Sequence, residues 1–276
     1  MNQIKILQKP NLVISYTRNE RGKKLKQYPK TEKYDKTWIE KNWMGPNPLW
    51  LTEELCEHID LRPGMKVLDM GCGKGITSVF LAKEYGVTVF ANDLWISATD
   101  NLRRFEEAGV SDKVFPIKAE AHALPYAEGF FDVVLSIDSY HYFGASESYF
   151  VDVFSKLAKP GAHIGVIVPG LKREYENGYP ETLKDLWFPE LFTFHSNEWW
   201  RKLWEKTGLC EITACYDIDD PKALWQPWAD WSVENFAKEF GDDGSGSADY
   251  DRRFLAADTN DDIALIAMAA RKKSDK

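Results

Sequence analysis

From about residue 49, short apolar segments alternate along the chain with longer segments that have helical spacing. The apolar segments are rich in β-branched residues and close on polar residues or glycine, which is typical of buried strands. The longer segments close on glycine or proline, which is typical of helices. The predicted strands are Met65–Met70, Val87–Asn92, Val114–Ala119, Phe131–Ile137 and His163–Val168. The predicted helices are Leu51–Ile59, Ile76–Tyr85, Ile96–Ala108 and Glu147–Leu157.

This alternation predicts an α/β fold, in which a mostly parallel sheet carries helices on both faces. The alternation stops after Gly170. Two later apolar segments, Cys210–Tyr216 and Ile263–Ala270, indicate closing strands and bring the expected sheet to about seven strands.

The most informative motif is a glycine-rich turn between the first predicted strand and its helix. Asp69, Gly71, Gly73 and Gly75 form the pattern D-x-G-x-G-x-G, and Asp93 closes the next strand. Glycines allow a tight turn and the close approach of a ligand to the backbone. An acid at the end of the next strand is placed to bind ribose hydroxyls. The dinucleotide pattern G-x-G-x-x-G and the phosphate-binding pattern G-x-x-x-x-G-K-[ST] are both absent, so the motif favours a ribose ligand without a pyrophosphate.

At these residues the chain resembles the class I S-adenosylmethionine-dependent methyltransferases, and in particular the UbiE-like small-molecule group. The resemblance covers about residues 45–170. It includes Ala119–Tyr126, which is similar to the family's G-D-A-x-x-L-P-F segment, and Leu157–Gly161, which is similar to its L-K-P-G-G turn. It implies a Rossmann-like doubly wound sheet, mostly parallel with one antiparallel edge strand. It also implies S-adenosylmethionine as cofactor and S-adenosylhomocysteine as product, and no metal.

The resemblance assigns a role to individual residues. The glycine loop with Asp69 would hold the methionine and ribose part of the cofactor, and Asp93 its ribose hydroxyls. The adenine would lie beside Leu94, Glu120 and Ala121. The segment after the fourth strand would face the methyl group and the substrate. The residues expected around the methyl group and the substrate are Tyr34, Asp138, Tyr140, His141 and Tyr142.

Two of these roles leave alternatives open. His141 matches the position of a general base in related O-methyltransferases, and an ordinary histidine can accept a proton at neutral pH. It could instead only shape the pocket among its aromatic neighbours. Tyr140, Tyr142 and the tryptophan-rich segments could line a pocket for an aromatic or cationic substrate, or they could be ordinary core residues.

The resemblance divides the chain into four parts. Residues 1–48 are expected to be a basic arm and a lid, and residues 49–170 the cofactor-binding core. Residues 171–207 are expected to be an aromatic cap. Residues 208–276 are expected to hold the closing strands and a second insertion at about 217–262, in which the Gly/Ser/Asp-rich segment Gly241–Ser247 indicates a loop.

Charge and composition limit the classes of molecule that the protein is expected to bind. The formal net charge is −8, yet residues 1–41 hold eleven Lys and Arg against four acids. An acidic body disfavours nucleic acid, so the basic arm alone supports the alternative of an RNA or protein methyltransferase. A third alternative is a module that binds the cofactor without chemistry. No apolar segment reaches the length of a membrane span, and four cysteines without metal spacing indicate reduced thiols in a cytoplasmic protein. The sequence leaves the acceptor atom and the oligomeric state open.

Overall fold

A seven-stranded mixed sheet forms the centre of the computed structural model, which describes residues 16–18, 24–240 and 248–274. The strand order is β5-β4-β3-β6-β7-β9-β8. All neighbouring strands from β5 to β7 pair in parallel, whereas β9 is antiparallel to both β7 and β8. The strands are β3 (Lys66–Met70), β4 (Thr88–Asp93), β5 (Val114–Lys118), β6 (Phe131–Ile137), β7 (Ala158–Leu171), β8 (Cys210–Asp217) and β9 (Ile263–Lys272).

The predicted fold class is confirmed, and all seven predicted strands form. The single antiparallel strand is β9, which lies next to the edge of the sheet, one position in from the edge strand β8. Strand β7 is longer than predicted because it already begins within the turn at Ala158. In the chain β3 is followed by β4 on one side of it, whereas the later strand β6 lies on its other side. The connections therefore change direction at β3, and the carboxyl ends of these strands border a crevice of the kind in which α/β sheets bind ligands.

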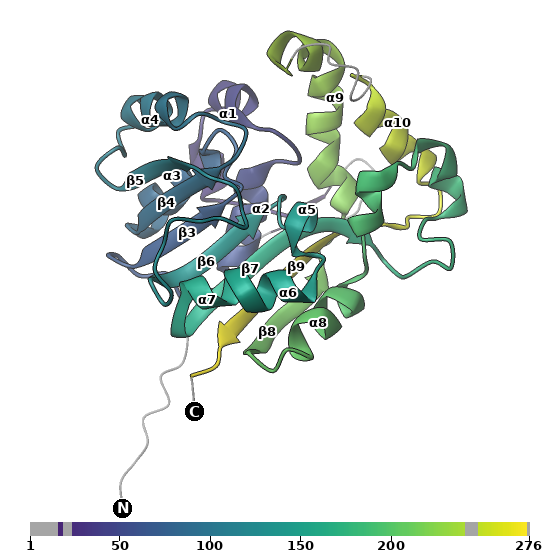
Figure 1. The fold of residues 1–276 in the computed structure, drawn as a ribbon. Helices are drawn as coiled ribbons and strands as arrows, with labels where there is room; N and C mark the ends of the chain where they lie inside the picture. The colour runs from purple at the N-terminus through teal and green to yellow at the C-terminus, as the bar shows by residue number, and fades with distance from the viewer. Residues whose placement is uncertain (1–15, 19–23, 241–247, 275–276) are drawn as a thin grey trace, which may run out of the picture.

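Helices cover both faces of the sheet (Figure 1). One face carries α2, α3, α4 and α9, and the other carries the run from α5 to α7 together with α8. The helices are α1 (Lys36–Asn42), α2 (Pro48–Cys56), α3 (Ile76–Tyr85), α4 (Ala98–Glu107), α5 (His141–Gly144), α6 (Glu147–Tyr149), α7 (Ser155–Leu157), α8 (Asn197–Glu205), α9 (Pro221–Phe240) and α10 (Tyr250–Ala257). A π-helical segment, η2 (Phe150–Phe154), joins α6 to α7, so the predicted helix over residues 147–157 is one continuous helical run.

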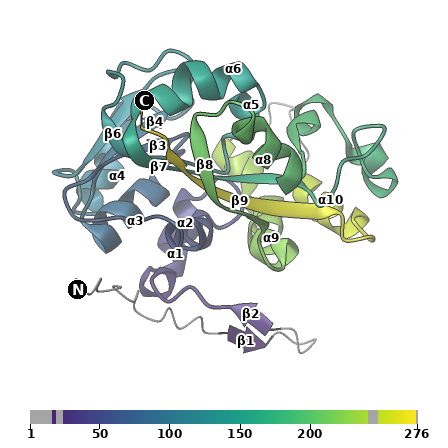
Figure 2. The same ribbon diagram turned by 90° about the horizontal axis from the view of Figure 1, so that it is seen from below.

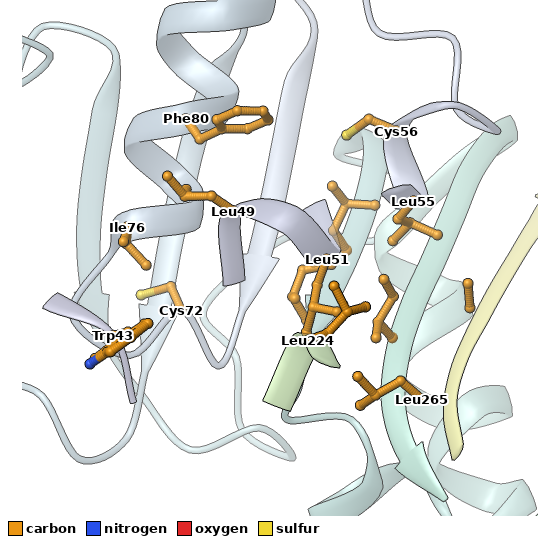
Figure 3. Packing of buried hydrophobic residues seen from close by; sticks show 14 of the residues in the cluster. Trp43, Leu49, Leu51, Leu55, Cys56, Cys72, Ile76, Phe80, Leu224 and Leu265 are labelled. Atoms are coloured by element: carbon orange, nitrogen blue, oxygen red, sulfur yellow. The ribbon is translucent and has the colours of Figure 1, made fainter. Parts of the chain in front are cut away.

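Successive strand residues are buried on opposite faces, as the two-residue period of a strand requires. In β3, Val67 belongs to the core under α2 and α3, and Leu68 belongs to the core under α8. Figure 3 shows the first of these cores, where Leu51 and Leu55 of α2 lie close to Leu265 of β9. Because both faces of the central strands are covered, these strands are mostly apolar, which is why their positions were readable in the sequence.

The aromatic residues between β7 and β8 divide between two environments. Trp200 and Trp204 on α8 are fully buried against the sheet, where they contact Tyr140. They are core residues and do not belong to a cap as we expected. The part that lies over the sheet end is the segment with the 3₁₀ turns η3 (Glu181–Leu186) and η4 (Pro189–Thr193).

The second insertion, at about residues 217–262, contains two helices, α9 and α10, that lie beside this segment (Figure 1). Trp187 contacts Phe254 of α10, and Phe188 contacts Tyr250. The two insertions therefore form one aromatic lobe at the carboxyl end of the sheet. The loop predicted at Gly241–Ser247 lies outside the described residues.

The described part of the N-terminal arm lies against α2. A two-stranded hairpin of β1 (Tyr16–Arg18) and β2 (Lys24–Lys26) projects below the sheet (Figure 2), and the 3₁₀ turn η1 (Thr31–Lys33) follows it. Lys26 forms ion pairs with Glu54 and Glu57, both at 2.8 Å. Lys26 therefore neutralises acids of the protein's own body, which is typical of a segment that is docked on that body. Among the described residues, no helix combines the length and the apolar character needed to cross a membrane.

Candidate functional site

A cavity of about 330 Å³ opens at the carboxyl ends of β3, β4 and β6. Its walls come from segments within residues 42–48, 70–77, 92–95, 119–122 and 137–143. Four of these segments follow strands of the sheet, and the first comes from the N-terminal arm. The cavity therefore occupies the place that the glycine motif and the strand order predict.

The glycine loop is fixed to the end of the neighbouring strand by its own backbone. The N–H groups of Gly71 and Cys72 donate to the carbonyl oxygen of Asn92, at 2.8 and 3.0 Å. Gly71 adopts a φ of 72°, and a Cβ there would lie 2.2 Å from Oγ of Ser139. A side chain at this position would thus both strain the backbone and collide with the segment after β6. Glycine is required here because two loops meet.

Asp93 connects the glycine loop to the loop after β4. Its Oδ2 accepts the N–H of Gly73 at 2.8 Å, and its Oδ1 accepts the N–H groups of Trp95 and Ile96 at 2.8 and 2.9 Å. A carboxylate offers about four acceptor positions, so one on Oδ2 stays available toward the cavity that Asp93 lines. This arrangement can accept a ribose hydroxyl, and it keeps the carboxylate in place without a ligand.

Asp69 and Gly75 lie behind the loop and do not line the cavity. Oδ2 of Asp69 accepts hydrogen bonds from the hydroxyls of Thr77 and Ser78, which ties the loop to the first turn of α3. Burial raises the pKa of Asp69 to about 6, although the two hydroxyls oppose this shift. The structure therefore gives Asp69 a role in positioning the loop, and Asp69 does not line the cavity in which it was expected to hold the methionine and ribose part of the cofactor.

The residues expected beside an adenine do gather on one wall. Leu94, Glu120 and Ala121 line the cavity with Trp95. The carboxylate of Glu120 is held by its own neighbour, because it accepts the backbone N–H of His122 at 2.7 Å and contacts the imidazole at 2.8 Å. Leu94 and Trp95 are exposed at 49% and 66%, which leaves an apolar surface open at the cavity rim.

The segment that leads from α1 to α2 crosses the cavity mouth. Met44, Gly45 and Pro46 line the cavity, and a Cβ on Gly73 would lie 3.0 Å from Sδ of Met44. Nζ of Lys74 donates to the carbonyl oxygen of Lys41 at 3.2 Å, which attaches this segment to the glycine loop. It has the position of the predicted lid. Tyr34, in contrast, lines neither this cavity nor the second one described below, and it packs on Trp38 and Phe80.

Asp138 lies where the cavity meets a second one of about 220 Å³. Its backbone is left-handed, with a φ of 56°, which is uncommon for a residue other than glycine and often accompanies a functional position. Burial, followed by the nearby charge of Asp251, raises the pKa of Asp138 to about 8. Tyr142 also lines both cavities. Asp138 and Tyr142 are thus shared by both spaces.

His141 and Tyr140 occupy other places than expected. His141 lines only the second cavity, where its ring packs against Tyr142 and Phe194 and its Nδ1 has no hydrogen-bond partner. Burial lowers the pKa of His141 to about 3, so the ring is a weak base at neutral pH. Tyr140 is fully buried in the core against Trp200 and Trp204 and does not line the substrate pocket. The structure favours the pocket-shaping role of His141.

The charged groups around the first cavity suit a cationic nucleoside. Three carboxylates, on Asp93, Glu120 and Asp138, line it together with one lysine, Lys74. No arginine lines it within the described residues. A pyrophosphate would meet repulsion from these acids, whereas a sulfonium with an attached ribose would be attracted. The donor and acceptor set therefore fits S-adenosylmethionine.

Comparison with known proteins agrees with this geometry. Residues 67–161 match the family model of a methyltransferase domain. That range begins in β3, contains the glycine loop and Asp93, and ends at the turn within β7. The match covers about a third of the chain, and together with the relatives it supports a class I S-adenosylmethionine-dependent methyltransferase.

Among its relatives is the sarcosine/dimethylglycine N-methyltransferase of Halorhodospira halochloris, which is 32% identical over 158 residues, or 50% of this chain and 57% of that protein. Two solved structures share the fold. The 4+2 cyclase SpnF has a TM-score of 0.67 at 21% identity over 82% of both chains. The phosphoethanolamine N-methyltransferase 2 of Haemonchus contortus, in complex with S-adenosylmethionine, has a TM-score of 0.67 at 18% identity over 91% of this chain and 62% of its own. The match thus covers just over half of the Halorhodospira protein and between 22% and 44% of the other curated relatives.

Sequence reasoning missed the residues that α9 and α10 bring to the site. Trp228 and Asp251 line the second cavity, and a hydrogen bond of 2.7 Å joins the indole nitrogen to the carboxylate. These residues lie more than 80 positions beyond Asp138 in an insertion without a recognised motif. The available signal was the three tryptophans at residues 225, 228 and 231, whose helical spacing indicates one face of a helix.

Proposed function

We propose that this protein transfers the methyl group of S-adenosylmethionine to a nucleophilic atom of a small molecule held in the aromatic lobe. The observation that carries this proposal is the pair of adjoining cavities at the end of the sheet. The first has the acceptors for a cationic nucleoside, and the second is lined by aromatic side chains. Met44, Gly45, Pro46, Asp138 and Tyr142 border both, so a transferred group can pass between them there.

The cofactor, when bound, supplies an electrophilic methyl group on a positively charged sulfur. The protein's own contribution is positioning, which is the main requirement of an in-line displacement. Asp93 would hold the ribose, and Leu94 and Ala121 would flank the adenine. Met44 and Gly45 would cover the cavity mouth and exclude water. Relatives that are N-methyltransferases of sarcosine and dimethylglycine or of phosphoethanolamine support a small acceptor.

Calorimetric titration with S-adenosylhomocysteine tests the first half of this proposal. We expect one site per chain, and we expect Asp93→Ala to weaken binding by about 10- to 150-fold, because hydrogen bonds to charged groups contribute about 1.5 to 3 kcal/mol. Asp112→Ala is the matched control, since Asp112 is exposed and lines neither cavity. An absence of binding by the unsubstituted protein would overturn the proposed function, because neither cavity would then be a cofactor site.

A further inference from the structure

The second cavity lies between the end of the sheet and the aromatic lobe. Asp138, His141 and Tyr142 come to it from β6 and α5, and Trp228 and Asp251 come from α9 and α10. The two elements that carry the acids are far apart in the sequence, so this pairing is a product of the fold alone. Side chains of both insertions line part of its wall, and Asp138 lines both this cavity and the first one.

The charges in this cavity are unbalanced. Asp138 and Asp251 both line it, and within the described residues no lysine or arginine does. The carboxylate of Asp138 forms no hydrogen bond with another described residue, while Asp251 accepts one from Trp228 at 2.7 Å. Partly buried acids without a cationic partner are costly in their charged form, so they either take up a proton or are compensated by a ligand or a metal. The described residues contain no cluster of metal-ligating side chains.

The titration behaviour of the neighbours leaves the two acids without compensation. In the first cavity the titratable groups that line the wall with Asp138 are Cys72, Lys74, Asp93, Glu120, His122 and Tyr142. In the second cavity they are His141 and Tyr142 of α5 and Tyr250 and Asp251 of α10. Burial lowers the pKa of His141 to about 3 and raises the pKa of Tyr142 to about 12, so both are neutral near pH 7. Burial also raises the pKa of Tyr250 and of Asp251. No cation of the cavity wall is present to offset the carboxylates.

Aromatic rings form the rest of the wall. Trp225, Trp228, Phe194 and Phe254 line the cavity with the two tyrosines. The faces of aromatic rings attract organic cations, most strongly where water is excluded. A space that combines two acids, no lysine or arginine and aromatic walls favours a ligand that is positively charged and partly apolar, because such a ligand stabilises the charged form of the acids.

From this juxtaposition, and resting on the proposed function, we propose that the second cavity binds the methyl acceptor as an amine cation. Asp138 and Asp251 supply its counter-charge, and Asp138 takes its proton. The proton passes from the ammonium nitrogen to the Asp138 carboxylate, which frees the nitrogen lone pair. That pair forms the new N–C bond while the S–C bond breaks and its electrons stay on sulfur. The products are a methylated ammonium and a neutral thioether, so atoms and charge balance.

The position of Asp138 suits both parts of this role. It lines the cofactor cavity as well as the second cavity, so a nitrogen beside its carboxylate is at the junction where transfer can occur. Its pKa, raised to about 8 by burial and then by Asp251, is that of a group able to accept a proton near neutral pH. Asp251 lines only the second cavity, so it acts as a counter-charge at a distance from the transfer.

Three probes that share one frame but differ in charge test the proposal: benzylamine, benzyl alcohol and benzoate. The frame is small enough, because a protein cavity of about 150 Å³ can hold benzene and this one has about 220 Å³. Each probe is titrated calorimetrically into the full chain saturated with S-adenosylhomocysteine. We expect benzylamine to bind at least tenfold more tightly than benzyl alcohol, and benzoate not to bind.

The variants Asp138→Asn and Asp251→Asn remove one charge each with little change of shape. Each should weaken benzylamine binding at least tenfold and leave benzyl alcohol within about twofold. The exposed variant Asp112→Asn serves as control. Binding of benzylamine at pH 7 should also release a proton, because a bound cation favours the charged form of Asp138. This release is measured as the dependence of the binding enthalpy on the ionisation enthalpy of the buffer. Asp138→Asn should abolish this release.

The outcomes separate the two proposals. Equal or tighter binding of benzyl alcohol or benzoate overturns the amine site, as does undiminished benzylamine binding in both aspartate variants. A protein that binds S-adenosylhomocysteine but no benzylamine retains the proposed function and loses only this inference. Binding of S-adenosylhomocysteine by each variant shows that the variant is folded.

Discussion

The close contact between the glycine loop and the segment after β6 gives a sharp stability prediction for Gly71→Ala. A Cβ at Gly71 would lie 2.2 Å from Oγ and 2.5 Å from Cβ of Ser139. Ser139 has little freedom to move, because its hydroxyl donates to the carbonyl oxygen of Met70 at 2.9 Å and also pairs with Ser136 at 2.7 Å. The substitution therefore forces two packed loops apart at the cavity wall.

Gly109→Ala is the matched control, because Gly109 has a similar φ of 69° but no atom within 4 Å of the added Cβ. Both substitutions cost about 1 kcal/mol or more for the left-handed backbone, which the lower entropy of the unfolded alanine chain partly offsets in both. Only Gly71→Ala adds the overpacking cost of about 1 to 3 kcal/mol. The free energy of unfolding should therefore fall by about 1 to 3 kcal/mol more for Gly71→Ala than for Gly109→Ala.

Urea denaturation, followed by tryptophan fluorescence, measures this difference. The same samples can be titrated with S-adenosylhomocysteine, whose affinity should fall in Gly71→Ala and not in Gly109→Ala. If the two variants lose the same stability to within about 0.5 kcal/mol and bind the ligand equally well, the close approach of the two loops does not exist in solution.

Two further predictions concern buried groups that titrate. Because burial raises the pKa of Asp69 to about 6 from 3.8, the folded protein binds the proton more tightly than the unfolded chain, so this group's contribution to stability falls as the pH rises from about 4 to 6. Asp69→Asn keeps an acceptor for Thr77 and Ser78, and its urea stability should be flatter by about 2 kcal/mol between pH 4 and 6; a parallel pH dependence of both proteins would reject the shift. For His141, with a pKa lowered to about 3, the imidazole NMR signals should not move between pH 5 and 8, while they should titrate normally in urea. A native midpoint near 6.5 would restore His141 as a candidate base.

Much of the fold was predictable because the physical signals were local. Helix α3 begins after Gly75 and ends before Gly86, both left-handed, and its predicted bounds are those of the structure. The central strands were readable because burial on both faces makes them mostly apolar. The glycine loop and Asp93 were also predictable, since a turn, its helix and the next strand lie within 25 residues of one another.

The acceptor side of the site was less predictable because its contacts are long-range. An aromatic residue has the same appearance in a core and in a pocket, so Tyr140 and Trp200 were assigned to the wrong surroundings. Trp200, Leu203 and Trp204 do follow the i, i+3, i+4 spacing of one buried helix face, and this spacing was the signal for α8. The meeting of Asp138 with Asp251 had no such signal, because it depends on how α10 folds back over the sheet end.

The central claim, that a methyl group passes from the first cavity to an acceptor in the second, has one direct measurement. The protein is incubated with S-adenosylmethionine carrying a carbon-13 methyl group and the small-molecule fraction of a cell extract, and mass spectrometry follows the label. We predict a labelled, positively charged methylated product together with S-adenosylhomocysteine, both lost in Asp93→Ala and strongly reduced in Asp138→Asn. A labelled product without positive charge would retain methyl transfer and reject the amine acceptor. No labelled product, and no S-adenosylhomocysteine above the level of Asp93→Ala, would contradict the claim.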